Sequence, residues 1–225
     1  MLNLVLAAIA FFGSHLILSS APLREPLVRT LGERGFRAGY STVAVASLIW
    51  LGFAYGAAPR QPLWDGAALR WVPVVVVPLA VLLAVGGLTQ RNPTVVGQRL
   101  DADGAAAATG MLRVTRHPFL WGVALWAAAH LVVKGDLPSL VLFGGMLAFS
   151  LAGASALDAK KRRQWGDRWD AFAAVTSPIP FAAIIAGRNR LDLGEIGWAR
   201  LAAAAAVAAL LAWLHPWIAG VPIVS

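Results

Sequence analysis

The sequence predicts an all-α, polytopic integral membrane bundle of about six transmembrane helices. Of its 225 residues, 59% are hydrophobic and only 13% are charged, and the mean hydropathy is +0.69. A soluble domain of this size carries about a quarter charged residues. Several apolar runs approach the roughly 20 residues that cross a bilayer as a helix. The longest non-apolar stretch is too short for a separate soluble domain, so we expect a single transmembrane domain over residues 1–225.

Each expected helix is an apolar run bounded by polar residues or proline. The predicted transmembrane helices cover about 2–20, 41–58, 71–88, 117–134, 138–157 and 199–219. The first run lacks a basic leader and a small-residue cleavage motif, so we interpret it as a helix and not as a signal peptide. The segment near 178–187 is too short to span and is expected to be re-entrant or interfacial. The arginine-bearing segment 21–40 is expected to form an interfacial turn or a short amphipathic helix.

The basic residues set the predicted orientation. The net charge is +8, and of the 19 Lys and Arg residues 16 fall in the first, third and fifth loops. Basic residues collect in cytoplasmic loops, so these three loops are predicted to be cytoplasmic and both termini to lie outside. Topology therefore accounts for a charge that in a soluble protein would suggest nucleic acid. The expected partner is membrane lipid, and no nucleic acid is expected.

The chain contains no cysteine. This excludes disulfides, thiolate metal sites, covalent haem attachment and a cysteine nucleophile. A transition metal would therefore have to be held mainly by histidine. The four histidines are His15, His117, His130 and His215.

His130 lies near the end of the expected helix 117–134. An ionisable ring inside a membrane helix is costly, and it suggests a functional site. Gly122, Trp126 and His130 are four residues apart and share one helix face. Gly122 would leave a shallow spot, and Trp126 a flat wall, for a planar macrocycle bound at His130. Alternatively, Gly122 allows close helix packing and His130 hydrogen-bonds a neighbouring helix.

The second membrane histidine is His15, which shares a helix face with Phe11, Phe12 and Ser19. A lone histidine in a membrane helix is as often a polar clasp between helices as a metal ligand. Two imidazoles on two apolar helices, in a chain without cysteine, suit bis-histidine ligation of a b-type haem. His15 and His130 are therefore the candidate metal ligands and catalytic residues.

The remaining histidines lie at predicted helix ends. Arg116 and His117 precede Pro118, which marks a helix start. This pair is a candidate for binding the anionic group of a cofactor. Alternatively, the two side chains snorkel to the interface and anchor the helix. His215, which is flanked by Trp213 and Trp217, is expected to be an interfacial anchor.

Several motifs together resemble the NnrU family, which includes the 15-cis-zeta-carotene isomerases of plants and cyanobacteria. They are SHL around His15, Tyr40-Ser41, TRHPFLWGVALWAAAHLVVKGD and LFGGM at 142–146. The resemblance covers essentially the whole chain and implies a multi-pass protein of the bacterial inner membrane. In the isomerase branch it implies a b haem whose ferrous form drives cis-to-trans isomerisation of a lipid-soluble polyene, with His15 and His130 as axial ligands. In the denitrifying branch it implies a role in nitrite or nitric oxide metabolism.

A second resemblance is to the isoprenylcysteine carboxyl methyltransferases. It is carried by Thr109-Gly110 before RHP, by KKRRQWGDRWDAF and by SPIP. It implies S-adenosylmethionine bound near Arg116 and His117. The sequence departs from that family at Asp158 and Ala159, where paired glutamates are usual. A membrane methyltransferase is therefore one alternative, and a non-enzymatic membrane factor whose histidines only clasp helices is another.

Overall fold

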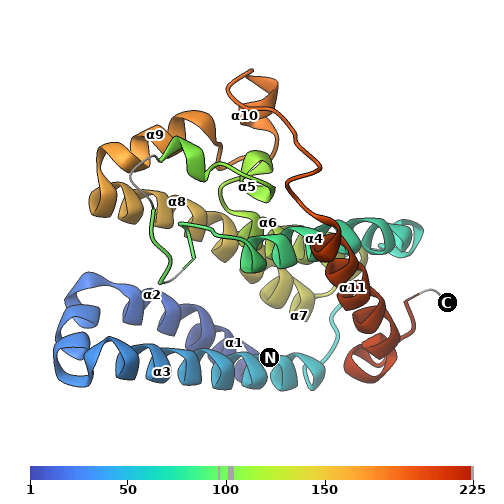
Figure 1. Cartoon of the computed structure of the whole chain (residues 1–225). Coiled ribbons are helices and arrows are strands. Elements are labelled where there is room, and N and C mark those ends of the chain that lie inside the picture. Colours follow the sequence, from blue (N-terminus) through green and yellow to red (C-terminus); the bar gives the residue numbers. More distant parts are fainter. Residues whose placement is uncertain (96, 101–103, 224–225) are drawn as a thin grey trace. The chain divides into compact units, whose positions relative to one another are not determined.

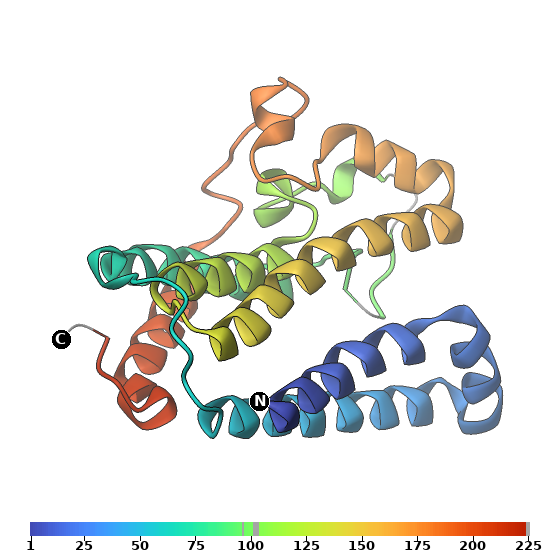
Figure 2. The ribbon, with the colours of Figure 1, turned by 180° about the vertical axis from the view of Figure 1, so that it is seen from behind.

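The computed structural model describes residues 1–95, 97–100 and 104–223, and within them it confirms the predicted all-α membrane fold (Figures 1 and 2). Among these residues there is no β-strand, only an isolated bridge between Pro62 and Asp136. The helical segments long and apolar enough to cross a membrane are Leu2–Ser19, Pro22–Gly56, Trp71–Thr89, Leu137–Trp165 and Trp198–Ala219. A further apolar helix, Pro118–Val133, has 16 residues, which corresponds to a length of roughly 24 Å.

The chain divides into two compact units. Unit 1 comprises Met1–Gly66 and Lys134–Gly145, and unit 2 comprises Ala67–Val133 and Met146–Ser225. In unit 1 the first span consists of α1 (Leu2–Ala8), the π-helical segment η1 (Ile9–Gly13) and α2 (Ser14–Ser19). It packs along the long helix α3 (Ala21–Gly56). The indole of Trp50 on α3 donates a hydrogen bond to Asn3 at the start of α1, which joins the two helices at that end.

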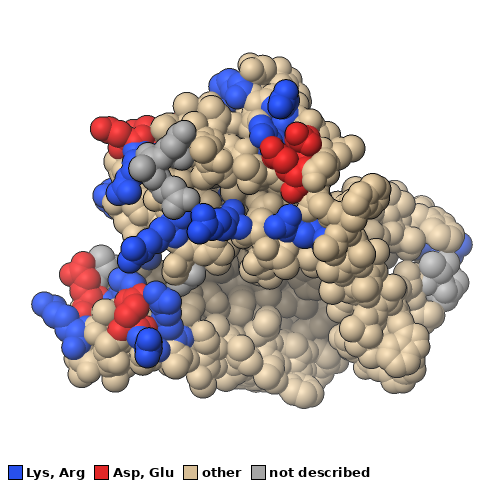
Figure 3. All heavy atoms as spheres, viewed as in Figure 1, with Lys and Arg blue, Asp and Glu red and all other residues tan. Residues whose placement is uncertain are grey.

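Of the two alternatives expected for segment 21–40, a turn or a short amphipathic helix, the structure has a helix, which forms the first part of the long helix α3. The helix tolerates Pro22 in its first turn, where a missing N–H costs little. Its path breaks only at Gly32, whose φ of +70° is readily adopted by glycine. Across this kink Glu33 accepts hydrogen bonds from Arg24, at 2.9 and 3.0 Å. Figure 3 shows a cluster of charged side chains over the end of unit 1 where α2 meets α3.

Unit 1 is completed by α7 (Leu137–Ser139) and a second π-helical segment, η4 (Leu140–Gly144). The carboxylate of Asp136 caps α7 by accepting a hydrogen bond from the Ser139 N–H. The Ser139 hydroxyl also pairs with the Tyr55 hydroxyl of α3 at 2.9 Å. Polar contacts therefore hold this short segment to the end of α3.

In unit 2, α4 (Trp71–Thr89) packs closely on α6 (Pro118–Val133). A Cβ added at Gly87 would lie 2.7 Å from the Phe119 backbone nitrogen, so only glycine allows this approach. Helix α11 (Trp198–Ala219) lies against α4, and most of its surface is exposed and apolar. Such a surface suits contact with lipid.

A polar cap covers one end of unit 2. It contains η3 (Ala105–Ala107), α5 (Met111–Val114), α9 (Asp167–Val175) and α10 (Ala182–Ile185). Its core packs Trp169 and Phe172 of α9 against Leu100, Ala108 and Leu112. The predicted short piece near 178–187 contains only α10, which is a single turn. Charged side chains lie over this cap in Figure 3.

The fifth span is longer than the predicted 138–157, because α8 (Gly145–Trp165) continues through the basic run at 160–163. Lysine and arginine are good helix formers and are favoured at a helix C-terminus. Gly166, at φ +52°, then separates α8 from α9. Helix α9, with Asp167 and Asp170 in its first turn, lies in a segment that was expected to be loop.

Candidate functional site

His15 lies on α2 in unit 1 and is partly buried. Its Nδ1 is 2.7 Å from the carbonyl oxygen of Phe11. A carbonyl only accepts, so Nδ1 is the donor in this bond and carries a proton. The imidazole stacks at a tilt on the Phe11 ring, at 4.5 Å, and meets the Tyr40 ring edge to face at 5.4 Å. Two rings and one hydrogen bond therefore fix its orientation.

The π-helical segment η1 directly precedes His15 and lines an apolar groove. Such segments are rare, and they occur frequently at functional sites. The groove has a volume of about 410 Å³ and is lined by Val5, Ala8, Ile9, Phe12, Gly13 and Val141. Every lining side chain is apolar or glycine, so the groove suits a hydrocarbon chain and offers no partner to a polar group.

His130 lies on α6 in unit 2 and repeats the geometry of His15. Its Nδ1 is 2.8 Å from the carbonyl oxygen of Trp126, one turn earlier, and its ring lies 5.2 Å from the Trp126 indole. Nδ1 is again the donor to a carbonyl and carries a proton. The predicted proximity of Trp126 and His130 on one helix face therefore holds.

Gly122 allows close packing of α6 on α4, as the alternative prediction had it. A Cβ added there would lie 2.6 Å from the Ala80 carbonyl oxygen and 3.0 Å from the Ala84 Cβ, both on α4. The space beside Gly122 is thus filled by α4 and is not open to a planar macrocycle. We correct the predicted cofactor contact at Gly122 to a helix-packing role.

Arg116 and His117 are buried in unit 2 and bind a carboxylate of the protein itself. The Nε2 of His117 is 2.7 Å from one oxygen of Asp158, and the Nε of Arg116 is 3.1 Å from the other. The side chain of His117 is 0% exposed and that of Arg116 is 9% exposed. We call these three residues the Arg116–His117–Asp158 triad.

The triad changes both interpretations of the Arg116–His117 pair. The side chains do not snorkel outward, and both contact the carboxylate of Asp158. Burial lowers the pKa of Arg116 from its ordinary value, while Asp158 opposes that shift. The Nδ1 of His117 is buried and has no hydrogen-bond partner among the described residues. A role of this pair in binding S-adenosylmethionine stays a prediction.

Sequence reasoning did not find the role of Asp158. Asp158 lies one residue beyond the predicted span 138–157, so it did not stand out as an ionisable group inside a membrane helix; it is the only acidic residue of the longer helix α8. His215 stays separate from these residues, on α11. Its Nδ1 is 2.9 Å from the Val221 carbonyl oxygen, next to the stacked rings of Trp213 and Trp217.

A metal bound by several side chains is not indicated in the part of the chain that the structure describes. No group of three or more His, Cys, Asp or Glu side chains gathers there. A porphyrin iron needs only one or two protein ligands, since the macrocycle supplies the others. A histidine on an apolar helix whose Nδ1–H is bound to a carbonyl suits such an iron, and His15 and His130 both have this geometry.

The apolar spans and the oriented histidines define a polytopic α-helical membrane protein whose apolar helices carry histidine side chains. The sequence matches the family model described as "NnrU protein" over residues 3–223. The chain therefore belongs to the NnrU family.

Two curated proteins are similar to one part of the chain. It is 35% identical over 83 residues to the chloroplastic 15-cis-zeta-carotene isomerase of Zea mays, and 36% identical over 83 residues to that of Arabidopsis thaliana. The matched part is 37% of this chain and 23% of each isomerase. This chain therefore spans less than a quarter of the curated relatives it matches. No solved structure matches the chain.

Proposed function

We propose that this NnrU-family protein binds haem b through His15 and His130 and acts as a redox-dependent cis–trans isomerase of a lipid-soluble polyene resembling zeta-carotene. The observation that carries the reaction is the similarity to two proteins named as 15-cis-zeta-carotene isomerases. When bound, the haem would supply a ferrous iron that transiently lowers the bond order of a conjugated double bond. We place the protein in a bacterial inner membrane with both termini outside.

The matched geometry of the two histidines supports the cofactor. Both rings donate Nδ1–H to the carbonyl four residues earlier, at 2.7 and 2.8 Å. Metal-binding histidines usually make such a bond, because it fixes the tautomer and increases the basicity of the other nitrogen. This shared geometry supports the ligand role of both rings.

The apolar groove of unit 1 supports a hydrocarbon substrate. Its wall includes Phe12 and Gly13 of η1, and the same segment supplies the Phe11 carbonyl that orients His15. At about 410 Å³ the groove would hold part of a long polyene. The groove residues would bind the hydrocarbon chain of the substrate and exclude water from it. The Phe11 carbonyl would hold the nearby His15 imidazole in one orientation.

The cofactor is tested by the absorption spectrum of the purified protein. After expression with ample haem, we expect a Soret band in the full-length protein. His15→Ala and His130→Ala should each reduce the haem content several-fold, because each removes a nitrogen that would hold the iron. His215→Ala is the matched control, since this ring also bonds a carbonyl through Nδ1 but lies at the end of α11. A wild-type protein without the band, or histidine variants as rich in haem as His215→Ala, would contradict the cofactor.

The reaction is tested separately on haem-loaded protein. Reduced protein is mixed with a 15-cis polyene, and the isomers are separated by chromatography. We expect conversion to the 15-trans isomer by the reduced protein and not by the oxidised protein. If a haem-loaded, reduced protein gives no product, the isomerase proposal fails while the haem proposal stands.

A further inference from the structure

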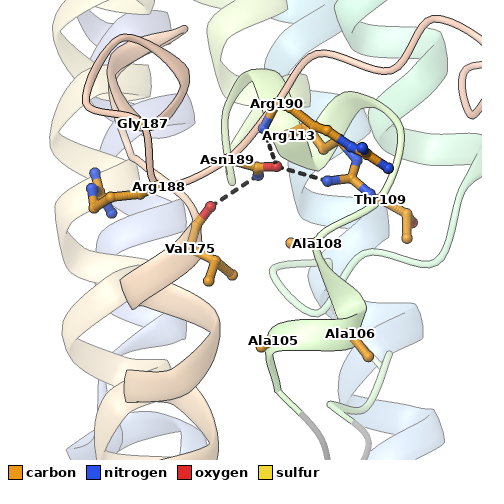
Figure 4. Close-up of a pocket in the computed structure, with 10 residues that line it drawn as sticks. All are labelled: Ala105, Ala106, Ala108, Thr109, Arg113, Val175, Gly187, Arg188, Asn189 and Arg190. Carbon is orange, nitrogen blue, oxygen red and sulfur yellow. Dashed lines mark hydrogen bonds between the residues drawn. The ribbon is translucent and has the colours of Figure 1, made fainter.

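The polar cap of unit 2 contains a cavity that the proposed isomerisation does not use. It has a volume of about 450 Å³. One wall comes from η3 and α5, and the other from the end of α9 and the segment 187–190 (Figure 4). The lining residues are Ala105, Ala106, Ala108, Thr109, Arg113, Val175, Gly187, Arg188, Asn189 and Arg190. The lining thus includes three arginines and no acidic residue.

Asn189 joins the two walls. Its side-chain oxygen accepts hydrogen bonds from Arg113 Nη1 and from the Arg190 N–H, both at 2.7 Å. Its side-chain nitrogen donates to the Val175 carbonyl at 2.9 Å. Gly187, at φ +68°, allows the turn that brings this segment back to α9. The cavity is therefore built by specific contacts, which Figure 4 shows as dashed lines.

The three arginines differ in their availability. Arg188 extends away from Asn189 in Figure 4, and its Nη1 donates to carbonyl oxygens at the end of α9, including Ala174 at 2.6 Å. Arg113 is held by the carboxylate of Glu195 through two bonds of 2.6 Å. These bonds lower the pKa of Glu195 to about 2, so this pair is charged and neutral overall at pH 7. Arg113 retains one N–H on each terminal nitrogen.

Arg190 is the third arginine that lines this cavity. Its side chain is exposed and makes no hydrogen bond among the described residues, although the Glu195 charge acts on it. Figure 4 shows it extending on the same side as Arg113. Thr109 offers a hydroxyl at the same rim, and three alanine methyl groups form an apolar wall. A guanidinium group fixed by Glu195 and Asn189, a second exposed guanidinium group, a hydroxyl and a small apolar surface are the recognition elements of an oxyanion with a compact organic body.

We propose that this cavity binds a phosphate ester through Arg190 and Arg113. A bare phosphate would fill only part of the space, since about 450 Å³ corresponds to roughly fifteen water molecules at the volume each occupies in the liquid. The phosphate could belong to a soluble ester or to a lipid headgroup. The second source is reasonable because the α11 span begins at Trp198, shortly after Arg190 in the sequence. The proposal is independent of the haem.

The test measures binding by the full-length protein in a phosphate-free neutral detergent. Glycerol 3-phosphate is the soluble probe and is followed by calorimetry, with glycerol as the uncharged comparison. Phosphatidylglycerol is the lipid probe, and its retention by delipidated protein is compared with that of phosphatidylcholine by native mass spectrometry. Binding of glycerol 3-phosphate assigns the site to soluble esters, and selective retention of phosphatidylglycerol assigns it to lipid.

Three variants distinguish binding at this specific cavity from nonspecific attraction of the probe to a positively charged protein. Arg190→Gln should weaken binding of the active probe by about tenfold or more, because it removes a charge-assisted hydrogen bond. Arg163→Gln removes the same charge from an exposed position on α8 and should leave binding unchanged. Ala106→Leu fills the apolar wall and should also weaken binding without any change of charge. If neither probe binds at millimolar concentration, or if Arg190→Gln and Arg163→Gln act equally, the proposal is wrong.

Discussion

At the scale of single residues, the best-defined polar feature is the Arg116–His117–Asp158 triad. The sequence allowed us to single out Arg116 and His117, because a basic pair before a proline marks a helix start. It did not identify their partner, which lies 41 residues away from His117 on another helix. Hydrophobic runs predict where helices lie, but not which polar side chains meet when helices pack. The two membrane histidines were identified for the opposite reason, since a lone ionisable group in an apolar run stands out by itself.

The triad predicts a large stability difference between two aspartates. Asp158→Ala leaves a buried arginine without its anion and removes the partner of a fully buried imidazole. We expect it to destabilise the protein by about 3 kcal/mol or more. Asp170→Ala breaks an exposed ion pair with Arg162. The Asp170 side chain is 54% exposed and the Arg162 side chain is 66% exposed. That change should cost less than about 1 kcal/mol.

Unfolding by denaturing detergent, followed by tryptophan fluorescence, measures both variants. Trp169 is a suitable reporter, because it is 1% exposed and Arg116 lies over its ring. Equal stability of the two variants would show that the triad does not hold α6 and α8 together.

At the scale of elements, apolar runs predicted the spans and missed what lies between them. The ends of α4 and α11 agree with the expected 71–88 and 199–219 to within about one residue. Helix α9 is not uniformly apolar, so run length could not reveal it, and for segment 21–40 the sequence left a turn and a short amphipathic helix open. The π-helical segment η1 has no sequence signal that we could have used. It is recognised only from the backbone, although it shapes the groove next to His15.

The groove predicts that one added side chain blocks the substrate. Gly13→Leu places an isobutyl group into the groove, and the nearest atom to a Cβ there is 4.0 Å away, so the backbone need not move. We expect kcat/KM for the 15-cis polyene to fall by about tenfold or more, with haem content unchanged. Gly52→Leu makes the same change at an exposed position of α3 with open space around it, and it should leave the rate unaltered. A rate that is equal in both variants would remove the groove from the substrate path.

At the scale of the whole molecule, the open question of topology is whether α6 crosses the membrane. At 16 residues it is shorter than the other spans. Between Gln61 and Arg163 the chain passes through α4, α6 and α8. If α6 crosses, three crossings separate these two positions, and they lie on opposite sides. If it does not cross, two crossings separate them, and they lie on the same side.

The absence of cysteine makes this question directly testable. Gln61→Cys and Arg163→Cys each introduce the single thiol of the chain, at positions exposed in their own units. The lopsided distribution of basic residues predicts that Arg163 is cytoplasmic and that Gln61 lies outside. A membrane-impermeant maleimide should therefore label the Gln61→Cys protein in intact cells, and the Arg163→Cys protein only after the inner membrane is permeabilised. Labelling of both from the same side would show that α6 does not cross. Labelling with the sides reversed would overturn the orientation, since three crossings would remain while the basic loops faced outward.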